Sequence, residues 1–537
     1  MFKRFLLFFC FILLASNLYN CAKRGMPTGG EIDTIPPVFI RSNPENFSTN
    51  FNAKEIRIYF DEYIKLDNPQ KQIIVSPPLD PKPEISPLGG ASKYIRVRIS
   101  DTLKENTTYS INFGNSIVDN NEGNPFQFFR YVFSTGDYID SLALRGTATN
   151  SLKRVIEEDI SVLLYEVDST YTDSLIYKEP PTYIAYTKDS THTFSVENMR
   201  AGTYQIVALK DNNNNYKYEP GSDKIGFKKE YITLPTEENI DLKIFKEILD
   251  FEVKRPKQLS KHHYIFGFEG EVDSTEIKLI SDKPNDYEYR IFKDSEKDTL
   301  HYWFKPKLEN DSLVFEIQKK TYRDTLVSKH RDMEADSLEI KVNPTSSLGF
   351  NKNVEIRANI PLEKIDTSKI SLLDKDFLAV RFTTHHEKFK NMYSIVFEKE
   401  EQQKYKLKML PGSITDFYGN TNDTLAYTLN TKAYSDLGNL KFTVQNIESY
   451  PVIVQLITEQ DEVYREQIHH ESDGNSFDFR YLEPNTYYVR VIYDTNNNGI
   501  WDTGSFLEKR QPEKVFYYPK SFTIRPNWDF TETFILK

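Results

Sequence analysis

The stretch of sequence that decides the fold occurs twice. Residues 194–221 read FSVENMRAGTYQIVALKDNNNNYKYEPG, and residues 477–504 read FDFRYLEPNTYYVRVIYDTNNNGIWDTG. The two stretches align without a gap, and the identical positions in the first are Phe194, Thr203, Tyr204, Asp211, Asn213, Asn214, Asn215 and Gly221. In both, apolar residues alternate with polar ones, which is typical of strands with one buried face. Self-similarity over this length indicates two copies of one module, which we place at 142–247 and 436–537.

A second, weaker repeat lies upstream of each of these modules. The strand-like segment 55–60 resembles 355–360, and each is followed by an Ile-x-Asp segment and a Gly-Asn turn (Ile117-Val118-Asp119 with Gly123-Asn124, and Ile414-Thr415-Asp416 with Gly419-Asn420). We therefore expect a related pair of modules at 37–137 and 343–434. Segment 248–342 has no counterpart elsewhere in the chain.

The apolar period is two nearly everywhere, and no segment shows a sustained amphipathic helical pattern. Turn residues follow at intervals of about ten residues, a spacing typical of β-sandwiches. The unmatched segment 248–342 has the same pattern, with apolar pairs such as Ile277 with Leu279 and Leu313 with Phe315. The sequence therefore predicts an all-β chain of tandem β-sandwich modules.

Composition excludes several classes of function. The chain has 537 residues, of which 14% are aromatic, too many for a disordered protein. Lys and Arg number 68 against 79 Asp and Glu, and the formal charge of −11 argues against a nucleic-acid partner or a polybasic membrane surface. Two cysteines provide neither a disulfide framework nor a cysteine-based zinc site.

The N-terminus predicts export. Residues 1–20 read as a signal peptide, with Lys3 and Arg4 before an apolar run that is too short to span a hydrocarbon core of roughly 30 Å. Cys10 lies within this run and would be removed with it. Cys21 then remains as the one thiol, directly after Leu18-Tyr19-Asn20, and the Gly- and Pro-rich residues that follow it predict a flexible tether over 21–36.

This arrangement resembles a lipoprotein processing site, in which the cysteine becomes the first residue and carries fatty-acyl chains. The resemblance implies that Cys21 is lipidated, for example with palmitate, and that membrane lipid is a partner. A secreted protein with a free cysteine is the alternative. Ala22 lacks the aspartate that often marks inner-membrane retention, which suggests the outer membrane, while Lys23-Arg24 differ from the acidic run that some groups use for surface export. Both leaflets of the outer membrane are therefore left as alternatives for the anchor.

Family resemblance extends over most of the mature chain. Residues 37–137 resemble the bacterial Ig-like domain of surface-layer type through Asn43-Pro44, the strand 56–60 and Asn106-Thr107-Thr108-Tyr109. Residues 343–434 look like a diverged copy. The modules at 142–247 and 436–537 resemble the prealbumin-like or carboxypeptidase-regulatory-like sandwich. The whole layout is similar to Ig-like-domain lipoproteins of Gram-negative outer membranes. Such motifs specify the fold well and the function poorly.

One motif suggests a metal ion. Asp494-Thr495-Asn496-Asn497-Asn498-Gly499 matches the start of an EF-hand-type calcium loop, and the predicted ligands are Asp494, Asn496, Asn498, Ile500 and Asp502. Position twelve is Ser505 rather than glutamate, and Glu508 is the expected substitute. A degenerate copy offers Asp211, Asn213, Asn215 and Glu219, with Tyr216 in place of glycine. The alternative is a pair of polar turns, in which Asn and Gly serve the turn geometry alone.

No other motif predicts chemistry. The histidine pairs 262–263, 385–386 and 469–470 should point to opposite faces of strands or turns, and we expect exposed polar residues there. Trp303, Trp501 and Trp528 could stack on sugars, but core or turn positions are commoner for tryptophan in strands. The sequence has no nucleotide-binding, zinc-protease or serine-hydrolase signature, so we expect no enzyme.

The sequence therefore predicts a non-catalytic outer-membrane lipoprotein that acts as a binding or structural scaffold at the cell envelope and has envelope or outer-membrane proteins as partners. One alternative is an accessory subunit of an outer-membrane protein assembly or export machine, because both kinds of module are common docking units. A glycan-binding or glycan-processing lipoprotein is the other alternative.

Overall fold

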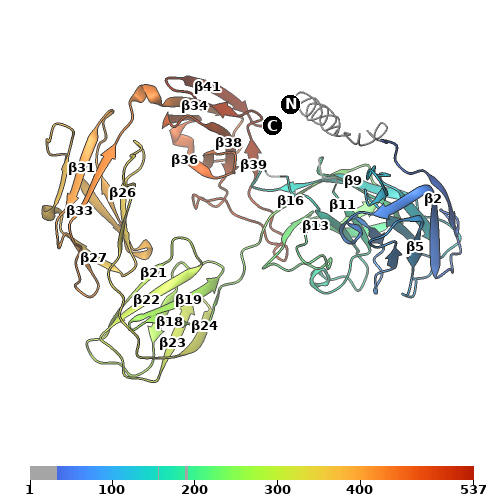
Figure 1. The fold of residues 1–537 in the computed structure, drawn as a ribbon, viewed down its shortest axis with the longest axis horizontal. Coiled ribbons are helices and arrows are strands. Elements are labelled where there is room, and N and C mark those ends of the chain that lie inside the picture. The colour runs from blue at the N-terminus through green and yellow to red at the C-terminus, as the bar shows by residue number, and fades with distance from the viewer. Residues whose placement is uncertain (1–32, 155, 188–190) are drawn as a thin grey trace, which may run out of the picture. The chain divides into compact units, whose positions relative to one another are not determined.

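The computed structural model describes residues 33–154, 156–187 and 191–537. These residues form a nearly all-β chain, which confirms the predicted fold class (Figure 1). The described helices are short: α2 (Pro69–Gln72), η1 (Asp173–Tyr177), η2 (Thr367–Lys369), η3 (Lys388–Lys390), η4 (Tyr434–Asp436) and η5 (Glu471–Asp473). None of them has the length and apolar character that a membrane crossing requires.

Contacts divide the chain into two compact units, and each is described by itself. Unit 1 comprises Met1–Ala143, Thr182–Ile184 and Val196–Ala201, and unit 2 comprises Leu144–Pro181, Ala185–Ser195 and Gly202–Lys537. The predicted signal peptide 1–20, Cys21 and most of the tether lie outside the described residues.

Unit 1 contains two facing sheets. The larger has the order β1-β2-β5-β4, with β7 paired to β2, and the smaller has the order β3-β6-β8. The strands are β1 (Phe39–Asn43), β2 (Glu55–Leu66), β3 (Ile74–Ser76), β4 (Glu84–Ser86), β5 (Ser92–Arg98), β6 (Thr108–Asn112), β7 (Ile117–Asp119) and β8 (Arg130–Ser134). Alternate residues of these strands, such as Ile56, Ile58 and Ile95, meet in a common apolar core.

The strands between residues 142 and 247 also form two sheets. One has the order β12-β9-β16, and the other has the order β11-β10-β13-β14 with β15 paired to β13. The strands are β9 (Leu142–Asn150), β10 (Ser161–Glu166), β11 (Tyr183–Tyr186), β12 (Thr193–Met199), β13 (Gly202–Lys210), β14 (Lys224–Phe227), β15 (Ile232–Leu234) and β16 (Asn239–Ile244).

The C-terminal residues repeat this topology. One sheet has the order β37-β34-β41, the other has the order β36-β35-β38-β39, and β40 pairs with β38. In both copies the last strand pairs in parallel with the first, β16 with β9 and β41 with β34. The strands are β34 (Gly438–Gln445), β35 (Val452–Ile457), β36 (Val463–His469), β37 (Ser476–Leu482), β38 (Thr486–Tyr493), β39 (Val515–Tyr517), β40 (Phe522–Thr523) and β41 (Asp529–Ile535).

Segment 248–342, which has no repeat partner, is built from two sheets as well. Their orders are β17-β19-β22-β21, with β18 paired to β19, and β20-β23-β24. Residues such as Tyr264, Phe266 and Phe315 fill the core between the sheets. The strands are β17 (Glu252–Val253), β18 (Lys257–Ser260), β19 (His263–Glu269), β20 (Glu276–Leu279), β21 (Glu288–Lys293), β22 (Thr299–Lys305), β23 (Ser312–Lys319) and β24 (Tyr322–Lys329).

The strands from residue 340 to 430 parallel those of unit 1, with one difference. The order β25-β26-β30-β29 matches β1-β2-β5-β4, and the sheet β28-β31-β33 matches β3-β6-β8. The long strand β2, however, corresponds to two strands, β26 and β27, of which β27 pairs with β32. The strands are β25 (Ile340–Asn343), β26 (Val354–Ala358), β27 (Leu362–Ile365), β28 (Ile370–Leu373), β29 (Thr383–Glu387), β30 (Met392–Val396), β31 (Lys404–Met409), β32 (Ile414–Asp416) and β33 (Leu425–Asn430).

Candidate functional site

The structure brings the predicted calcium ligands at the C-terminus into one loop after β38. The Asp494 carboxylate accepts the N–H groups of Asn498 (3.1 Å) and Gly499 (2.8 Å). Asp502 Oδ2 accepts the side-chain amides of Asn496 and Asn498, both at 2.7 Å. The loop is therefore closed by hydrogen bonds that converge on two carboxylates.

A third carboxylate joins this loop, and the sequence did not reveal it. Glu513 is buried, and its oxygens accept the N–H groups of Thr495 (2.6 Å) and Asp502 (3.0 Å). Glu508, the expected substitute ligand, instead bonds Arg510 at 3.2 Å. In the described residues, no group of three or more His, Cys, Asp or Glu side chains is arranged to hold a metal ion.

The degenerate copy has the same geometry. Asp211 accepts the N–H groups of Asn213 (3.0 Å) and Tyr216 (2.7 Å), and Glu219 accepts the amides of Asn213 and Asn215. Burial raises the pKa of the Asp211 carboxyl above its ordinary value, against these N–H donors, which lower it. The four predicted residues are thus brought together as in the other copy.

Asp223 plays the part in the first loop that Glu513 plays in the second. It is fully buried and accepts the N–H groups of Asn212 (3.1 Å) and Glu219 (2.9 Å). Both acidic residues are followed by lysine (Asp223-Lys224 and Glu513-Lys514) shortly before a strand, and this shared pattern is the signal that could have found them.

The second loop leads into a contact between the two repeated modules, which we name the repeat contact. It joins residues 503–511 and strands β38 and β39 to residues 152–154, 173, 227 and 245–247. Its hydrogen bonds and ion pair are Arg490 Nη1 to Leu152 O (2.9 Å), the Tyr517 hydroxyl to the same Leu152 O, Thr503 Oγ1 to Lys246 O (2.7 Å), the Phe506 N–H to Glu247 Oε1 (2.6 Å), Gln511 Nε2 to Phe227 O (2.9 Å) and Lys509 Nζ to Asp173 Oδ1 (2.6 Å).

Aromatic rings complete the repeat contact. Phe506 is fully buried and meets Phe227 edge to face, with ring centroids 5.2 Å apart. The Arg154 guanidinium lies 3.3 Å from the centre of the Tyr488 ring. Such edge-to-face and cation–π geometries are individually favourable. The contact combines apolar burial with directional hydrogen bonds, as a specific interface does.

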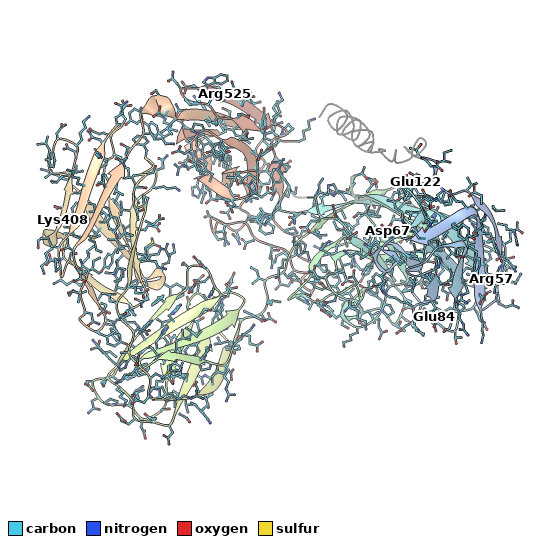
Figure 2. The ribbon with its side chains drawn as sticks, viewed as in Figure 1. Arg57, Asp67, Glu84, Glu122, Lys408 and Arg525 are labelled. Carbon is cyan, nitrogen blue, oxygen red and sulfur yellow. The ribbon has the colours of Figure 1, made fainter. Side chains whose placement is uncertain are left out.

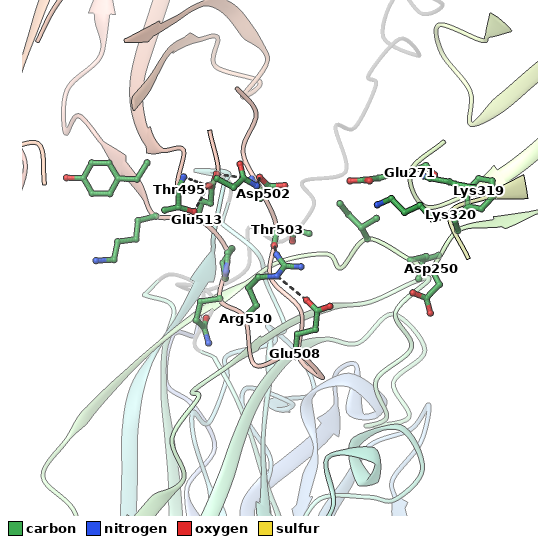
Figure 3. A pocket seen from close by; sticks show the side chains of 18 of the residues that line it. Asp250, Glu271, Lys319, Lys320, Thr495, Asp502, Thr503, Glu508, Arg510 and Glu513 are labelled. Atoms are coloured by element: carbon green, nitrogen blue, oxygen red, sulfur yellow. Dashed lines mark hydrogen bonds and ion pairs between the residues drawn. The ribbon is translucent and has the colours of Figure 1, made fainter. Parts of the chain in front are cut away.

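A pocket of about 1140 Å³ lies beside the repeat contact (Figure 3). Figure 3 shows Thr495, Asp502 and Glu513 on one side and Glu271, Lys319 and Lys320 on the other. Its charges are mixed, since four basic side chains face six acidic ones: Lys319, Lys320, Arg510 and Lys514 against Asp250, Glu271, Glu448, Asp502, Glu508 and Glu513. This mixture selects no single class of ligand.

The prediction of exposed histidines holds for His385 and His470, whereas His262, His386 and His469 are half-buried and His263 is buried, where the prediction is wrong. His263 is buried, stacks on Trp303 with centroids 3.9 Å apart, and shares a 2.9 Å hydrogen bond with His301, which in turn bonds Asp294 at 3.1 Å. Burial, followed by the charge of His301, lowers the pKa of His263 to about 3. The reason is tertiary: Phe292 and Trp303 on this sheet pack against residues 360 and 417, which cover the face.

The tryptophans lie in three different environments. Trp303 is buried against His263, and Trp501 is half-buried and donates Nε1–H to Glu513 O at 3.1 Å. Trp528 is 48% exposed, with the Arg525 guanidinium 5.1 Å from its ring. The three rings do not form a common platform for a sugar in the described structure.

Comparisons with known proteins find one family match and solved structures of low similarity. The family model of the bacterial Ig-like domain matches residues 33–135. A comparison with curated proteins finds no match. Among solved structures, the S-layer protein rSbsC is 10% identical with a TM-score of 0.17, and the alignment covers 91% of this chain and 67% of that chain.

Two further solved structures have similar sequence identities and TM-scores. The Bacillus anthracis TIE protein is 11% identical with a TM-score of 0.15, over 95% of this chain and 76% of that one. The major pilin subunit BcpA of Bacillus cereus is 11% identical with a TM-score of 0.14, over 74% and 99%. Residues 33–135 are thus matched by the bacterial Ig-like domain family, in a chain whose described residues are nearly all-β and for which no enzyme family is indicated.

Proposed function

We propose that this chain is a non-catalytic outer-membrane lipoprotein that serves as a multidomain binding and structural scaffold at the cell envelope. The observation that carries the proposal is the position of Cys21, the one cysteine that follows the apolar N-terminal run. An unpaired thiol is unusual in an oxidising compartment, and acylation accounts for it. Two or more acyl chains anchor a protein stably, whereas one does so only reversibly.

The described architecture supports the scaffold role. The Ig-like match at 33–135 and the all-β sandwiches provide rigid modules, and the comparisons indicate no enzyme family. Strands β24, β36 and β41 each end a sheet, so an unpaired strand edge is available in several modules. A partner protein can add a strand to such an edge. These edges also favour the alternative role as a subunit of an outer-membrane machine.

Metabolic labelling with a palmitate analogue tests the anchor. We expect label on the mature wild-type chain and on Cys10→Ser, and none on Cys21→Ser, which should leave the membrane fraction. Unlabelled wild-type protein, or a Cys21→Ser variant that still sediments with membranes, would refute the lipoprotein assignment. Gentle detergent extraction followed by mass spectrometry distinguishes the roles, because a stoichiometric barrel protein is expected only of a machine subunit.

A further inference from the structure

An exposed sheet face in unit 1 carries an unusual set of side chains. We name it the arginine face and define it as Arg41 on β1, Arg57 and Tyr59 on β2, and Tyr94, Arg96 and Arg98 on β5. Since side chains alternate along a strand, these residues point away from the core residues Ile56, Ile58, Ile95 and Val97. Figure 2 labels Arg57 among the side chains of this unit.

The strand register arranges these side chains in rows. Tyr59 is paired with Arg41 on one side and Tyr94 on the other. The tyrosine rings lie 5.6 Å apart, and the Arg41 guanidinium lies 4.2 Å from the Tyr59 ring. The next row places Arg57 directly opposite Arg96. Two arginines in a cross-strand pair repel each other and destabilise the sheet.

Neighbouring carboxylates neutralise the face in part. Glu55 bonds Arg57 at 2.7 Å, and Glu84 lies 4.0 Å from Arg98. The backbone of Arg96 takes part in the sheet, but no hydrogen bond or ion pair joins its side chain to another residue within the described ranges. Four arginines against two glutamates leave a positive face in a chain of charge −11. This face is therefore electrostatically complementary to an acidic ligand.

The second copy of the module shows that the fold does not require this face. Glu355 and Arg357 there repeat Glu55 and Arg57 and keep their ion pair, at 3.2 Å. Their cross-strand partners on β30, however, are Ser394 and Met392 in place of Arg98 and Arg96. The arginines of β5 are therefore a property of this surface and not of the sandwich.

We propose that the arginine face binds an acidic polypeptide segment of a partner protein. A carboxylate between Arg57 and Arg96 would take N–H bonds from the guanidinium groups and relieve their repulsion, and Tyr59 with Tyr94 offers an aromatic contact beside it. Tyrosine and arginine are the residues that protein interfaces use most as anchors. Glu55 and Glu84 disfavour a uniformly anionic lipid or glycan, whereas a protein can place a cation against them.

The test uses the full chain and a fluorescent peptide of alternating Glu and Ala as the probe. We expect anisotropy to show salt-dependent binding that Arg96→Gln and Arg57→Gln weaken by about fivefold or more, the loss of one charge-assisted contact. The matched control is Arg357→Gln, which occupies the same position in the other copy and should bind as the wild type does. Arg96→Lys should restore binding only in part, because lysine lacks the planar fork.

Thermal unfolding separates binding from folding. Since Arg96→Gln removes a repulsive pair, its melting temperature should equal or exceed that of the wild type while its binding falls. Equal binding by all variants would overturn the proposal, and so would binding to heparin or to phosphatidylglycerol vesicles but not to the peptide. This proposal rests on the proposed scaffold role and does not require the lipid anchor. Palmitate labelling therefore tests the anchor alone, and peptide binding tests the arginine face alone.

Discussion

Tyr216 occupies the place of Gly499 in the first Asp/Asn loop, yet both residues have a positive φ, 59° and 78°. Such a backbone costs free energy for tyrosine, because its Cβ crowds the chain. The N–H of Tyr216 bonds Asp211 at 2.7 Å, as that of Gly499 bonds Asp494 at 2.8 Å. The carboxylate therefore holds the turn in both copies, and glycine is not needed to form it.

Calcium binding by the second loop is testable at this scale. A rotation of the Asn496 and Asn498 amides would turn their oxygens toward Asp494 and Asp502, which gives the all-oxygen site that calcium prefers. In roughly millimolar calcium, calorimetry should then show a higher melting temperature than in chelator, and Asp502→Ala should abolish the difference. Glu219→Ala, the equivalent change in the first loop, is the matched control and should keep the difference between calcium and chelator. An unchanged melting temperature of the wild type would exclude a structural calcium ion.

Because the buried imidazole of His263 has a lowered pKa, we expect the protein to lose stability in acid. Its pKa is about 3 in the folded chain and about 6.5 when unfolded, so the unfolded chain binds the proton more readily. Stability is therefore complete above pH 6.5 and falls as the pH drops from 6.5 toward 3. At pH 4.5 the loss should be about 2 kcal/mol, from about 1.4 kcal/mol for each pKa unit, discounted for relaxation around the buried ring.

Urea unfolding followed through Trp303 checks this expectation, in a background that carries Trp501→Phe and Trp528→Phe. Between pH 7.5 and pH 4.5, His263→Gln should lose about 2 kcal/mol less free energy of unfolding than the background does. His470→Gln, at an exposed position, should behave as the background. If His263→Gln and the background lose the same free energy, the buried imidazole is not the cause.

At the scale of elements, the apolar period of two could predict the strands, and the repeat could predict that β9 to β16 and β34 to β41 share a topology. The repeat could not predict that the strand corresponding to β2 is divided into β26 and β27 in the second copy. Pro361 stands between those strands, and proline has no N–H to donate to the ladder. The calcium-loop pattern ends before Glu513 and Asp223, so only their shared position before a lysine and a strand could have indicated them. The burial of His263 could not be predicted, because it depends on residues 360 and 417, which are distant in the chain.

The parallel strand β41 should be essential to the C-terminal sandwich. It pairs with β34 along its whole length, and Phe442 on β34, which is fully buried, has the Phe534 ring 6.3 Å away. A chain truncated after Asn527 loses this ladder and exposes part of the core. Trypsin should then digest 436–527 rapidly while 37–434 persists, whereas removal of Lys537 alone should change nothing. Equal resistance of both chains would show that β41 is dispensable.

At the scale of unit 2, contacts between successive modules form a closed ring, which we call the circuit. Trp303 and Phe292 pack against residues 360 and 417, Phe350 packs against Tyr434 and Tyr481, and the repeat contact returns to residues 152–247. Sequence patterns could not predict this circuit, because its partners come from different modules and no local period records them. The circuit joins the two copies of one module through different surfaces on each.

Gly504 provides a sharp test of the repeat contact. A Cβ at this position would lie 2.4 Å from Cζ of Phe245 and 2.7 Å from the Arg510 carbonyl oxygen, whereas a Cβ at the equivalent Gly221 would meet nothing within 4 Å. Gly504→Ala should therefore weaken the repeat contact by about 1–3 kcal/mol, the usual cost of overpacking, and Gly221→Ala should not.

Spin labels at Lys153→Cys and Lys520→Cys, in a Cys10→Ser, Cys21→Ser background, would report the separation of the two modules. We expect one narrow distance distribution for the background and for Gly221→Ala, and a broader, longer one for Gly504→Ala. An unchanged distribution in Gly504→Ala would mean that the contact tolerates the added methyl group.

The repeat contact also decides how unit 2 would respond to stretching. Tension applied between Leu144 and Lys537 passes straight from the first repeated module into the second, through bonds that act together. Segment 248–434 connects the same two modules by a second, longer path. Once the contact ruptures, we expect the longer path through segment 248–434 to lengthen the chain before any sandwich unfolds.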